Sequence, residues 1–325
     1  MRIPVRATAI IAIAGGVTAA AIIAWTAASS PPTASAAGDV GAAVARSAPG
    51  LAKPSATPSA TPPVRLIGAP TGVQARAGLL ADANTGAVLW SRGLNTELPM
   101  GSITKVMTAL VVIRAGDLNR EIRIPKSVIA YVSKYGGESA GLIPGDVVTA
   151  QELLEAMLLP SGCDAAYTLA MAYGPGMPAF LAKMNKTAKQ LGMLHTRFTS
   201  PDGLPYPGEF STFSTPKDLV TLGMAAMKSA VFRSIVAQPF YQLHKGPGHH
   251  AYWWDNDNDL IGTYPGATGI KTGYTNAALH CLLFSASRHG LNLIGVVLGS
   301  PATSPAAGAE AAAKVLNWGF SLPRT

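Results

Sequence analysis

Serine and lysine side chains recur in three short motifs that follow one another in a fixed order. The motifs are Ser102-Ile-Thr-Lys105, Ser161-Gly-Cys163 and Lys271-Thr-Gly273. A serine hydroxyl is a weak nucleophile until a neighbouring group takes its proton. A lysine that is kept neutral by burial or by a second cation can do so. The residue types therefore predict a serine acyltransferase, with Ser102 as the nucleophile and Lys105 as its base.

The first motif falls where a turn gives way to a helix. Proline and glycine in Leu98-Pro-Met-Gly101 precede Met107–Ile113, which is apolar on nearly all sides and predicts a buried helix. Ser102 is expected at or near the N-terminus of that helix, where unpaired N–H groups and the helix dipole favour developing negative charge. Lys105 follows at i+3, so both side chains project from one face. The alternative, a helix cap beside a surface lysine, leaves the other two motifs without a role.

The third motif lies in Gly266–Thr275, a segment rich in glycine and threonine that predicts a strand. Gly273 leaves room for a substrate backbone against the strand, and the hydroxyls and the ammonium can hold a carboxylate. The alternative is a strand edge with a solvated lysine.

The elements around the motifs predict an α+β fold. A hairpin is expected over Ala77–Asp82 and Ala87–Trp90. The middle of the chain carries helix signals, and the end of the chain carries strand signals. One expected helix follows the capping box Thr149-x-x-Glu152 up to Pro160, and a second spans Pro178–Leu191. A third begins at Thr215, and a fourth runs from a cap at Ser304-Pro305 to Trp318. The expected strands are 269–274, 280–287 and 291–298. This order predicts an antiparallel sheet covered by helices, with an inserted helical region.

The first seventy residues differ from the rest. Residues 1–36 predict an export signal: a basic start, the apolar run Ala7–Trp25, and the small residues Ala34-Ser-Ala36 for cleavage. An uncleaved membrane anchor is the alternative. Residues 37–70 are rich in Ala, Pro, Ser and Thr and predict a tether, because they lack apolar periodicity. Residues 71–325 are expected to form the catalytic domain.

The formal charge of +8 does not predict a nucleic-acid partner. Residues 1–70 carry five Lys/Arg and one Asp, so half of the excess lies outside the expected domain, and no basic run is interleaved with aromatics. Cys163 and Cys281 are expected to be buried, unbridged thiols, with a disulfide as the alternative.

No metal or other cofactor is predicted. The histidines His244, His249 and His250 match no metal-binding spacing, and the acidic run Trp253–Asp259 lacks the glycine and distal glutamate of a calcium loop. A structural role is expected for Asn256 and Asn258 within that run.

The motif set resembles a known family. Ser-x-x-Lys, Ser-x-Asn and Lys-Thr-Gly are the signatures of penicillin-binding proteins and class A β-lactamases. The longer strings Leu159–Ala166, Phe198–Leu204 and Pro265–Thr275 resemble the D-alanyl-D-alanine carboxypeptidases, the low-molecular-mass penicillin-binding proteins, over about residues 75 to 320. The resemblance implies a β-lactamase/DD-peptidase-like fold.

The resemblance also implies roles for individual residues. Ser102 would be acylated, Lys105 would be the general base, and Ser161 would relay a proton toward the leaving amine. The substrate-binding group would comprise Cys163, Lys271, Thr272, Gly273, Tyr274 and Thr275, with the carboxylate held by Lys271 and Thr272 and the oxyanion by the N–H groups of Ser102 and Tyr274. Cys163 departs from the family, which usually has asparagine there. The chain also ends about fifty residues after Lys271, so membrane attachment is expected only through the N-terminal segment.

The function implied is an exported, monomeric D-Ala-D-Ala carboxypeptidase. It would act on peptidoglycan stem peptides at the cell envelope, be inhibited by β-lactams, and use no cofactor. Three alternatives stay open: a DD-transpeptidase with an amine acceptor, a serine β-lactamase, and an inactive wall-binding scaffold. The β-lactamase lacks support because no glutamate lies in a Glu-x-x-x-Asn context.

Overall fold

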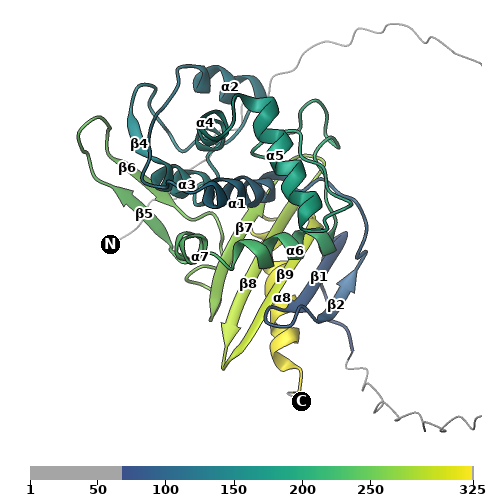
Figure 1. Ribbon diagram of the computed structural model, residues 1–325. Helices are drawn as coiled ribbons and strands as arrows, with labels where there is room; N and C mark the ends of the chain where they lie inside the picture. The colour runs from purple at the N-terminus through teal and green to yellow at the C-terminus, as the bar shows by residue number, and fades with distance from the viewer. Residues whose placement is uncertain (1–67, 324–325) are drawn as a thin grey trace, which may run out of the picture. The chain divides into compact units, whose positions relative to one another are not determined.

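A five-stranded antiparallel sheet lies at the centre of the protein (Figure 1). The structure is a computed structural model that describes residues 68–323, so the predicted export signal and nearly all of the predicted tether lie outside the described residues. The strands run in the order β2 (Val88–Arg92), β1 (Ala77–Asp82), β9 (Leu291–Ser300), β8 (His280–Arg288) and β7 (Ala267–Gly273). Segments from both ends of the described chain therefore build one sheet, and β7 forms an edge of it.

Helices cover both faces of this sheet. Those of the described residues are α1 (Lys105–Ala115), α2 (Ser127–Tyr135), α3 (Ala150–Leu158), α4 (Cys163–Tyr173), α5 (Met177–Gln190), α6 (Pro216–Ala226), α7 (Ala230–Ala237) and α8 (Ala307–Ser321). All but α8 come from the segment between β2 and β7, and α1 to α5 gather at one end of the sheet (Figure 1). The predicted insertion of a helical region is confirmed.

The side chains of β9 alternate between the two hydrophobic cores that lie on opposite faces of the sheet. Leu293 and Val297 are buried in the cluster that α8 enters, whereas Ile294 and Val296 are buried in the larger cluster with α1 and α6. Because successive side chains of a strand point to opposite faces, a run of apolar residues in β9 can serve both cores. The strand is consequently buried on both sides.

Two short ribbons lie outside the central sheet. One pairs β3 (Glu121–Arg123) with β4 (Val147–Thr149), and the other pairs β5 (Phe240–Leu243) with β6 (Tyr252–Asp255). Neither ribbon was predicted from the sequence.

Two predicted helix starts are confirmed by their caps. The Thr149 hydroxyl accepts from the Glu152 N–H and the Glu152 carboxylate accepts from the Thr149 N–H at the start of α3. The Thr215 hydroxyl accepts from the Asp218 N–H at the start of α6. The predicted cap at Ser304-Pro305 is wrong, because the Ser304 hydroxyl accepts from the N–H of Ala306 and closes a turn before α8 begins.

Within residues 68–323, no single helix has the length and apolar character to cross a membrane. Taken together, α6 and α7 have the length and apolar composition of a membrane span, but their axes are bent by 107° relative to each other.

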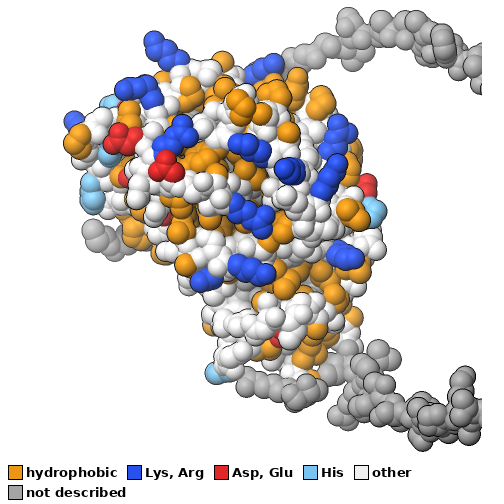
Figure 2. All heavy atoms as spheres, viewed as in Figure 1, with side chains coloured by type: hydrophobic (Ala, Val, Ile, Leu, Met, Phe, Trp, Pro, Cys, Tyr) orange, Lys and Arg blue, Asp and Glu red, His pale blue; other side chains and the backbone are white. Residues whose placement is uncertain are grey.

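Basic side chains are spread over the face that carries α1, α5 and α6 (Figure 2). On this face the Lys and Arg side chains are separated by apolar and uncharged surface. They form no continuous positive track there.

Glu155, on α3, has a side chain that is buried against the segment that follows α7. It is 4% exposed, and the Gln238 amide donates to its carboxylate. Burial raises the pKa of Glu155 to about 8, and the hydrogen bond from Gln238 opposes only part of that change. The folded protein therefore holds Glu155 protonated at neutral pH.

Replacing Glu155 by glutamine is expected to change how stability depends on pH. Between about pH 4.5 and pH 8 the unfolded chain ionises this group while the folded chain keeps its proton, so the free energy of unfolding falls as pH rises. The glutamine variant lacks this contribution, which is on the order of a few kcal/mol. Its thermal midpoint should therefore rise relative to that of the parent between pH 5 and pH 8. Glu209→Gln, at an exposed position, is the control; parallel pH profiles for Glu155→Gln and the parent would contradict the assignment.

Candidate active site

Ser102 and Lys105 meet at the start of α1. Ser102 lies in a 3₁₀ turn, Gly101–Thr104, and Lys105 is the first residue of α1. The Lys105 Nζ lies 2.8 Å from the Ser102 Oγ, so the i+3 spacing places both groups on one side of the chain as predicted. Lys105 is 0% exposed, and its Nζ also donates to the Asp202 carbonyl at 3.1 Å. No carboxylate of the described residues lies within 4 Å of it.

The motif residues surround one cleft of about 630 Å³. Its walls include the 3₁₀ turn, the loop after α2, the turn before α4, the segment after β6, the end of β7, and the starts of β8 and α8. Of the predicted site residues, the lining includes Ser102, Ser161, Cys163, Thr272, Gly273 and Tyr274.

Ser161 points an unpartnered hydroxyl at this cleft. It is 1% exposed, its Oγ has no hydrogen-bond partner among the described residues, and its φ is 64°. A residue other than glycine in this region of φ carries strain of about 1–3 kcal/mol, and such strain gathers at functional sites. The hydroxyl is therefore available to a partner other than the described residues.

Lys271 lies on β7, where its side chain is 1% exposed. Its Nζ donates to the Thr272 Oγ at 3.0 Å. Burial lowers the pKa of Lys271 to about 8, while the charge of Asp257 opposes that change. A bound carboxylate would favour the charged form of this lysine.

Glycine is required where β7 passes the 3₁₀ turn. A Cβ on Gly273 would lie 2.3 Å from the Met100 carbonyl oxygen and 3.2 Å from the Ser102 nitrogen, and a Cβ on Gly101 would lie 2.7 Å from the Tyr274 nitrogen. The two backbones are thus in direct contact. This contact places the backbone nitrogen of Tyr274 close to the 3₁₀ turn that carries Ser102.

Thr275 directly follows Tyr274 but is not part of the cleft lining. Its Oγ accepts from the Ala278 N–H in the turn after β7. The hydroxyl therefore stabilises this turn, and its proton is free to donate to a ligand.

Cys163 borders the cleft and is nevertheless buried. It is 2% exposed, and its Sγ accepts from the Lys105 Nζ at 3.4 Å. Burial raises the pKa of Cys163 to about 12, and Lys105 offsets part of that change. Cys281 is also buried and free, with a pKa raised by burial to about 12. The expectation of two unbridged thiols is confirmed, and both are protonated at neutral pH.

Asp164 holds the cleft wall in place, a role that the motifs did not predict. Its carboxylate accepts from the Ser139 hydroxyl at 2.6 Å and from the N–H groups of Ala140 and Leu142 at 2.9 and 3.1 Å. The loop after α2 is thereby fixed to α4. The only signal in the sequence was the position of Asp164 directly after the second motif.

Three cleft carboxylates also escaped prediction. Glu138, Asp257 and Asp259 line the cleft. Burial raises the pKa of Asp257 to about 6, while the charge of Lys271 opposes the change. Asn256, which precedes Asp257, has the predicted structural role, because its amide donates to the carbonyls of Val236 and Gln238.

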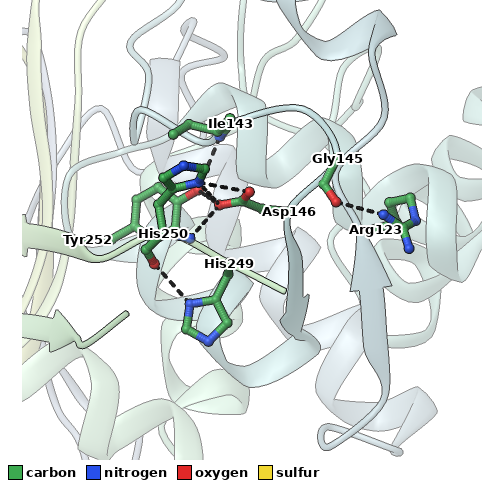
Figure 3. Close-up of polar contacts among 7 residues, drawn as sticks. All are labelled: Arg123, Ile143, Gly145, Asp146, His249, His250 and Tyr252. Carbon is green, nitrogen blue, oxygen red and sulfur yellow. Dashed lines mark hydrogen bonds and ion pairs between the residues drawn. The ribbon is translucent and has the colours of Figure 1, made fainter. Parts of the chain in front are cut away.

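Two of the three histidines noted in the sequence, His249 and His250, bind protein groups. The His250 Nδ1 and N–H both contact the Asp146 carboxylate, and the His249 Nδ1 contacts the His250 carbonyl (Figure 3). Burial opposes ionisation of Asp146, but the hydrogen bonds from His250 and Tyr252 lower its pKa. The described residues contain no group of three or more possible metal ligands.

Comparison with known proteins agrees with this geometry. The family model for D-alanyl-D-alanine carboxypeptidases matches residues 65–302. The chain is 39% identical over 272 residues to the D-alanyl-D-alanine carboxypeptidase of Streptomyces sp. strain K15. The aligned region covers 80% of this chain and 91% of that protein. It is also 39% identical over 251 residues to the D-alanyl-D-alanine carboxypeptidase DacB2 of Mycobacterium tuberculosis, covering 76% and 83% of the two chains.

Solved structures show the same fold. The crystal structure of the Streptomyces K15 DD-transpeptidase matches with a TM-score of 0.74 at 38% identity, over 79% of this chain and 100% of that one. The D-alanyl-D-alanine carboxypeptidase of M. tuberculosis H37Rv matches with a TM-score of 0.70 at 35% identity, over 79% and 97%. The predicted DD-peptidase-like α+β fold is confirmed. The chain therefore belongs to the D-alanyl-D-alanine carboxypeptidase family.

Proposed function

We propose that this protein is a serine D-alanyl-D-alanine carboxypeptidase that removes the terminal D-Ala from peptidoglycan stem peptides. The observation that carries the proposal is the 2.8 Å contact between the Ser102 Oγ and the fully buried Lys105 Nζ, at a cleft that also contains the unpartnered Ser161 hydroxyl. This arrangement provides a nucleophile, a base and a second proton carrier in one place.

The reaction follows from these groups. The Ser102 Oγ attacks the carbonyl carbon of the penultimate D-Ala while the Lys105 Nζ takes the hydroxyl proton. The N–H groups of Ser102 and Tyr274 receive the charge that develops on the carbonyl oxygen. Ser161 passes a proton to the departing amine, so terminal D-Ala leaves and an ester to Ser102 remains. Water then resolves this acyl-enzyme.

Lys271 and Thr272 hold the carboxylate of the terminal D-Ala in this proposal. A charged lysine at hydrogen-bond distance from a hydroxyl offers two kinds of donor to one carboxylate. β-Lactams, which also carry a carboxylate beside a reactive carbonyl, would occupy the same place and acylate Ser102. Cys163 takes the place of an amide, so this position supplies packing next to Lys105 in place of a substrate contact.

A DD-transpeptidase is a second candidate. It is favoured by the likeness to the Streptomyces K15 protein, whose solved structure is named a DD-transpeptidase. The two activities share every step up to the acyl-enzyme and differ in whether water or an amine resolves it.

We place the protein on the outer side of the cytoplasmic membrane or beyond it, because residues 1–36 have the composition of an export signal. We also propose that it acts as a monomer.

A pentapeptide that ends in D-Ala-D-Ala tests the proposal. The purified protein is expected to release one D-Ala per peptide, as detected by mass spectrometry of the products. In the presence of an added amine, a transpeptidase would yield a peptide–amine adduct as its main product, whereas a carboxypeptidase would yield the shortened peptide. Absence of both products from an enzyme that is acylated by penicillin would overturn the peptidase assignment.

A further inference from the structure

The hairpin of β5 and β6 has an inner face that is fixed to the rest of the protein. On this face Trp254 is 2% exposed and its indole N–H donates to the Ala140 carbonyl at 2.8 Å. The Tyr252 hydroxyl donates to the Asp146 carboxylate and accepts from the Ile143 N–H (Figure 3). The hairpin is therefore held to the 140–146 segment along its length.

The outer face of the same hairpin carries two partly exposed aromatic rings that stack on each other. Phe240 and Trp253 are 44% and 52% exposed, and their rings stack with centroids 4.4 Å apart and an interplanar angle of 14°. The Trp253 indole N–H donates to the Asp255 carboxylate at 2.8 Å, which fixes the ring in its plane. Gln242, also exposed, lies directly opposite Trp253 in the strand register. We call these four residues, Phe240, Gln242, Trp253 and Asp255, the hairpin platform.

The hairpin platform leads directly into the catalytic cleft. Asp255 ends β6, and the next two residues, Asn256 and Asp257, line the cleft. The Asn256 N–H donates to the Pro239 carbonyl, so the base of the hairpin is closed at this point. The platform residue Asp255 is therefore joined directly to the segment that forms one wall of the cleft.

The chemistry of the platform fits a saccharide. A sugar ring has a face of C–H groups that packs on an aromatic ring and an edge of hydroxyls that need donors and acceptors, which the Gln242 amide and the Asp255 carboxylate supply. The platform contains no Lys or Arg, so it has no means to attract an anionic polymer. Two rings also present much less surface than the roughly 800 Å² per partner of a stable protein interface.

We propose that the hairpin platform is a saccharide subsite, which holds the glycan part of the substrate while its peptide occupies the cleft. This proposal rests on the proposed function, because a stem peptide is carried by a saccharide polymer. Since the rings are already stacked and the hairpin is fixed on its inner face, binding orders few side chains. The subsite would select peptides that are still attached to glycan over free peptides.

The test compares two substrates that share one pentapeptide. One substrate is the free peptide, and the other is the same peptide linked to a short soluble oligosaccharide of the cell wall. Trp253→Ala is expected to lower kcat/KM for the linked substrate about three- to tenfold, the range that one aromatic contact supplies. The same variant should leave kcat/KM for the free peptide unchanged. Trp253→Phe should retain most of the preference, and Leu194→Ala, at another exposed apolar residue, is the control.

A binding measurement separates this proposal from the proposed function. The peptide-free oligosaccharide should perturb tryptophan fluorescence of the Ser102→Ala protein, which binds without turnover, and Trp253→Ala in that background should remove the change. Equal kcat/KM losses for both substrates, no loss for either, or no saccharide binding would overturn the subsite, even if D-Ala is released from the free peptide. A dimer that dissociates in the Trp253→Ala variant would also overturn it, because the platform would then be covered by a second copy.

Discussion

Replacement of Ser102 by alanine is expected to abolish covalent labelling of the protein by a penicillin. The Ser102 Oγ is the proposed nucleophile, and alanine retains no nucleophile at that place. The protein should still fold, because Ser102 is only partly buried and its side chain contributes one contact, to the Lys105 Nζ. The thermal midpoint should therefore stay within a few degrees of that of the parent, as expected for a change of about 1 kcal/mol or less.

Mass spectrometry of the intact protein measures this result directly, since each acylation adds the mass of one penicillin. Ser133→Ala is the control, because Ser133 is an exposed serine on α2 outside the cleft. Labelling of the Ser102→Ala protein at a rate near that of the parent would show that another residue is the nucleophile. Lasting label on the parent would agree with a peptidase, whereas rapid loss of the label would favour the β-lactamase alternative.

Local signals explain why the contact between Ser102 and Lys105 could be predicted. The i+3 spacing of Ser102 and Lys105 fixes their relation within one turn, whatever the rest of the fold does. The apolar run after them identifies α1 as a buried helix, and burial of Lys105 follows from its place at the start of that helix. The strands β7, β8 and β9 carried equally local patterns.

Residues that depend on contacts distant in sequence could not be predicted. Asp257 reaches the cleft because the segment after β6 passes the end of α3, where the Asp257 N–H donates to the Leu159 carbonyl. Each strand of the ribbon contains only four residues, which is too short for an alternating pattern to distinguish a strand from a loop. Packing between segments that are distant in sequence determines these positions. The residue pattern of a single segment does not reveal such packing.

The strained conformation of Ser161 is another feature that could not be predicted from the sequence. A φ of 64° in a residue other than glycine has no sequence signal, since serine is found mostly at negative φ. It is maintained by its neighbours: a Cβ on Gly162 would lie 2.6 Å from the Ala156 carbonyl, and the Cys163 N–H donates to the Glu138 carbonyl at 2.8 Å. The motif indicates which residues meet, and the surrounding backbone determines how they are oriented.

Replacement of Lys105 by arginine is expected to lower the rate of acylation by at least about 100-fold, the smallest effect typical for loss of a general base. A guanidinium stays protonated at any pH that the protein survives, so it can keep the positive charge but cannot take the Ser102 proton. The rate of penicillin acylation, measured by stopped-flow or quenched mass spectrometry, reports this step alone.

Lys271→Arg provides the matched comparison. Both lysines are fully buried, so the larger guanidinium imposes similar crowding at either position. At Lys271, however, the proposed task is to hold a carboxylate, which arginine also does, and a smaller loss is expected there. Equal losses in the two variants would mean that crowding, and not proton transfer, explains the effect at Lys105. A Lys105→Arg protein that acylates at the parental rate would require a different base, such as one of the cleft carboxylates Glu138, Asp257 and Asp259.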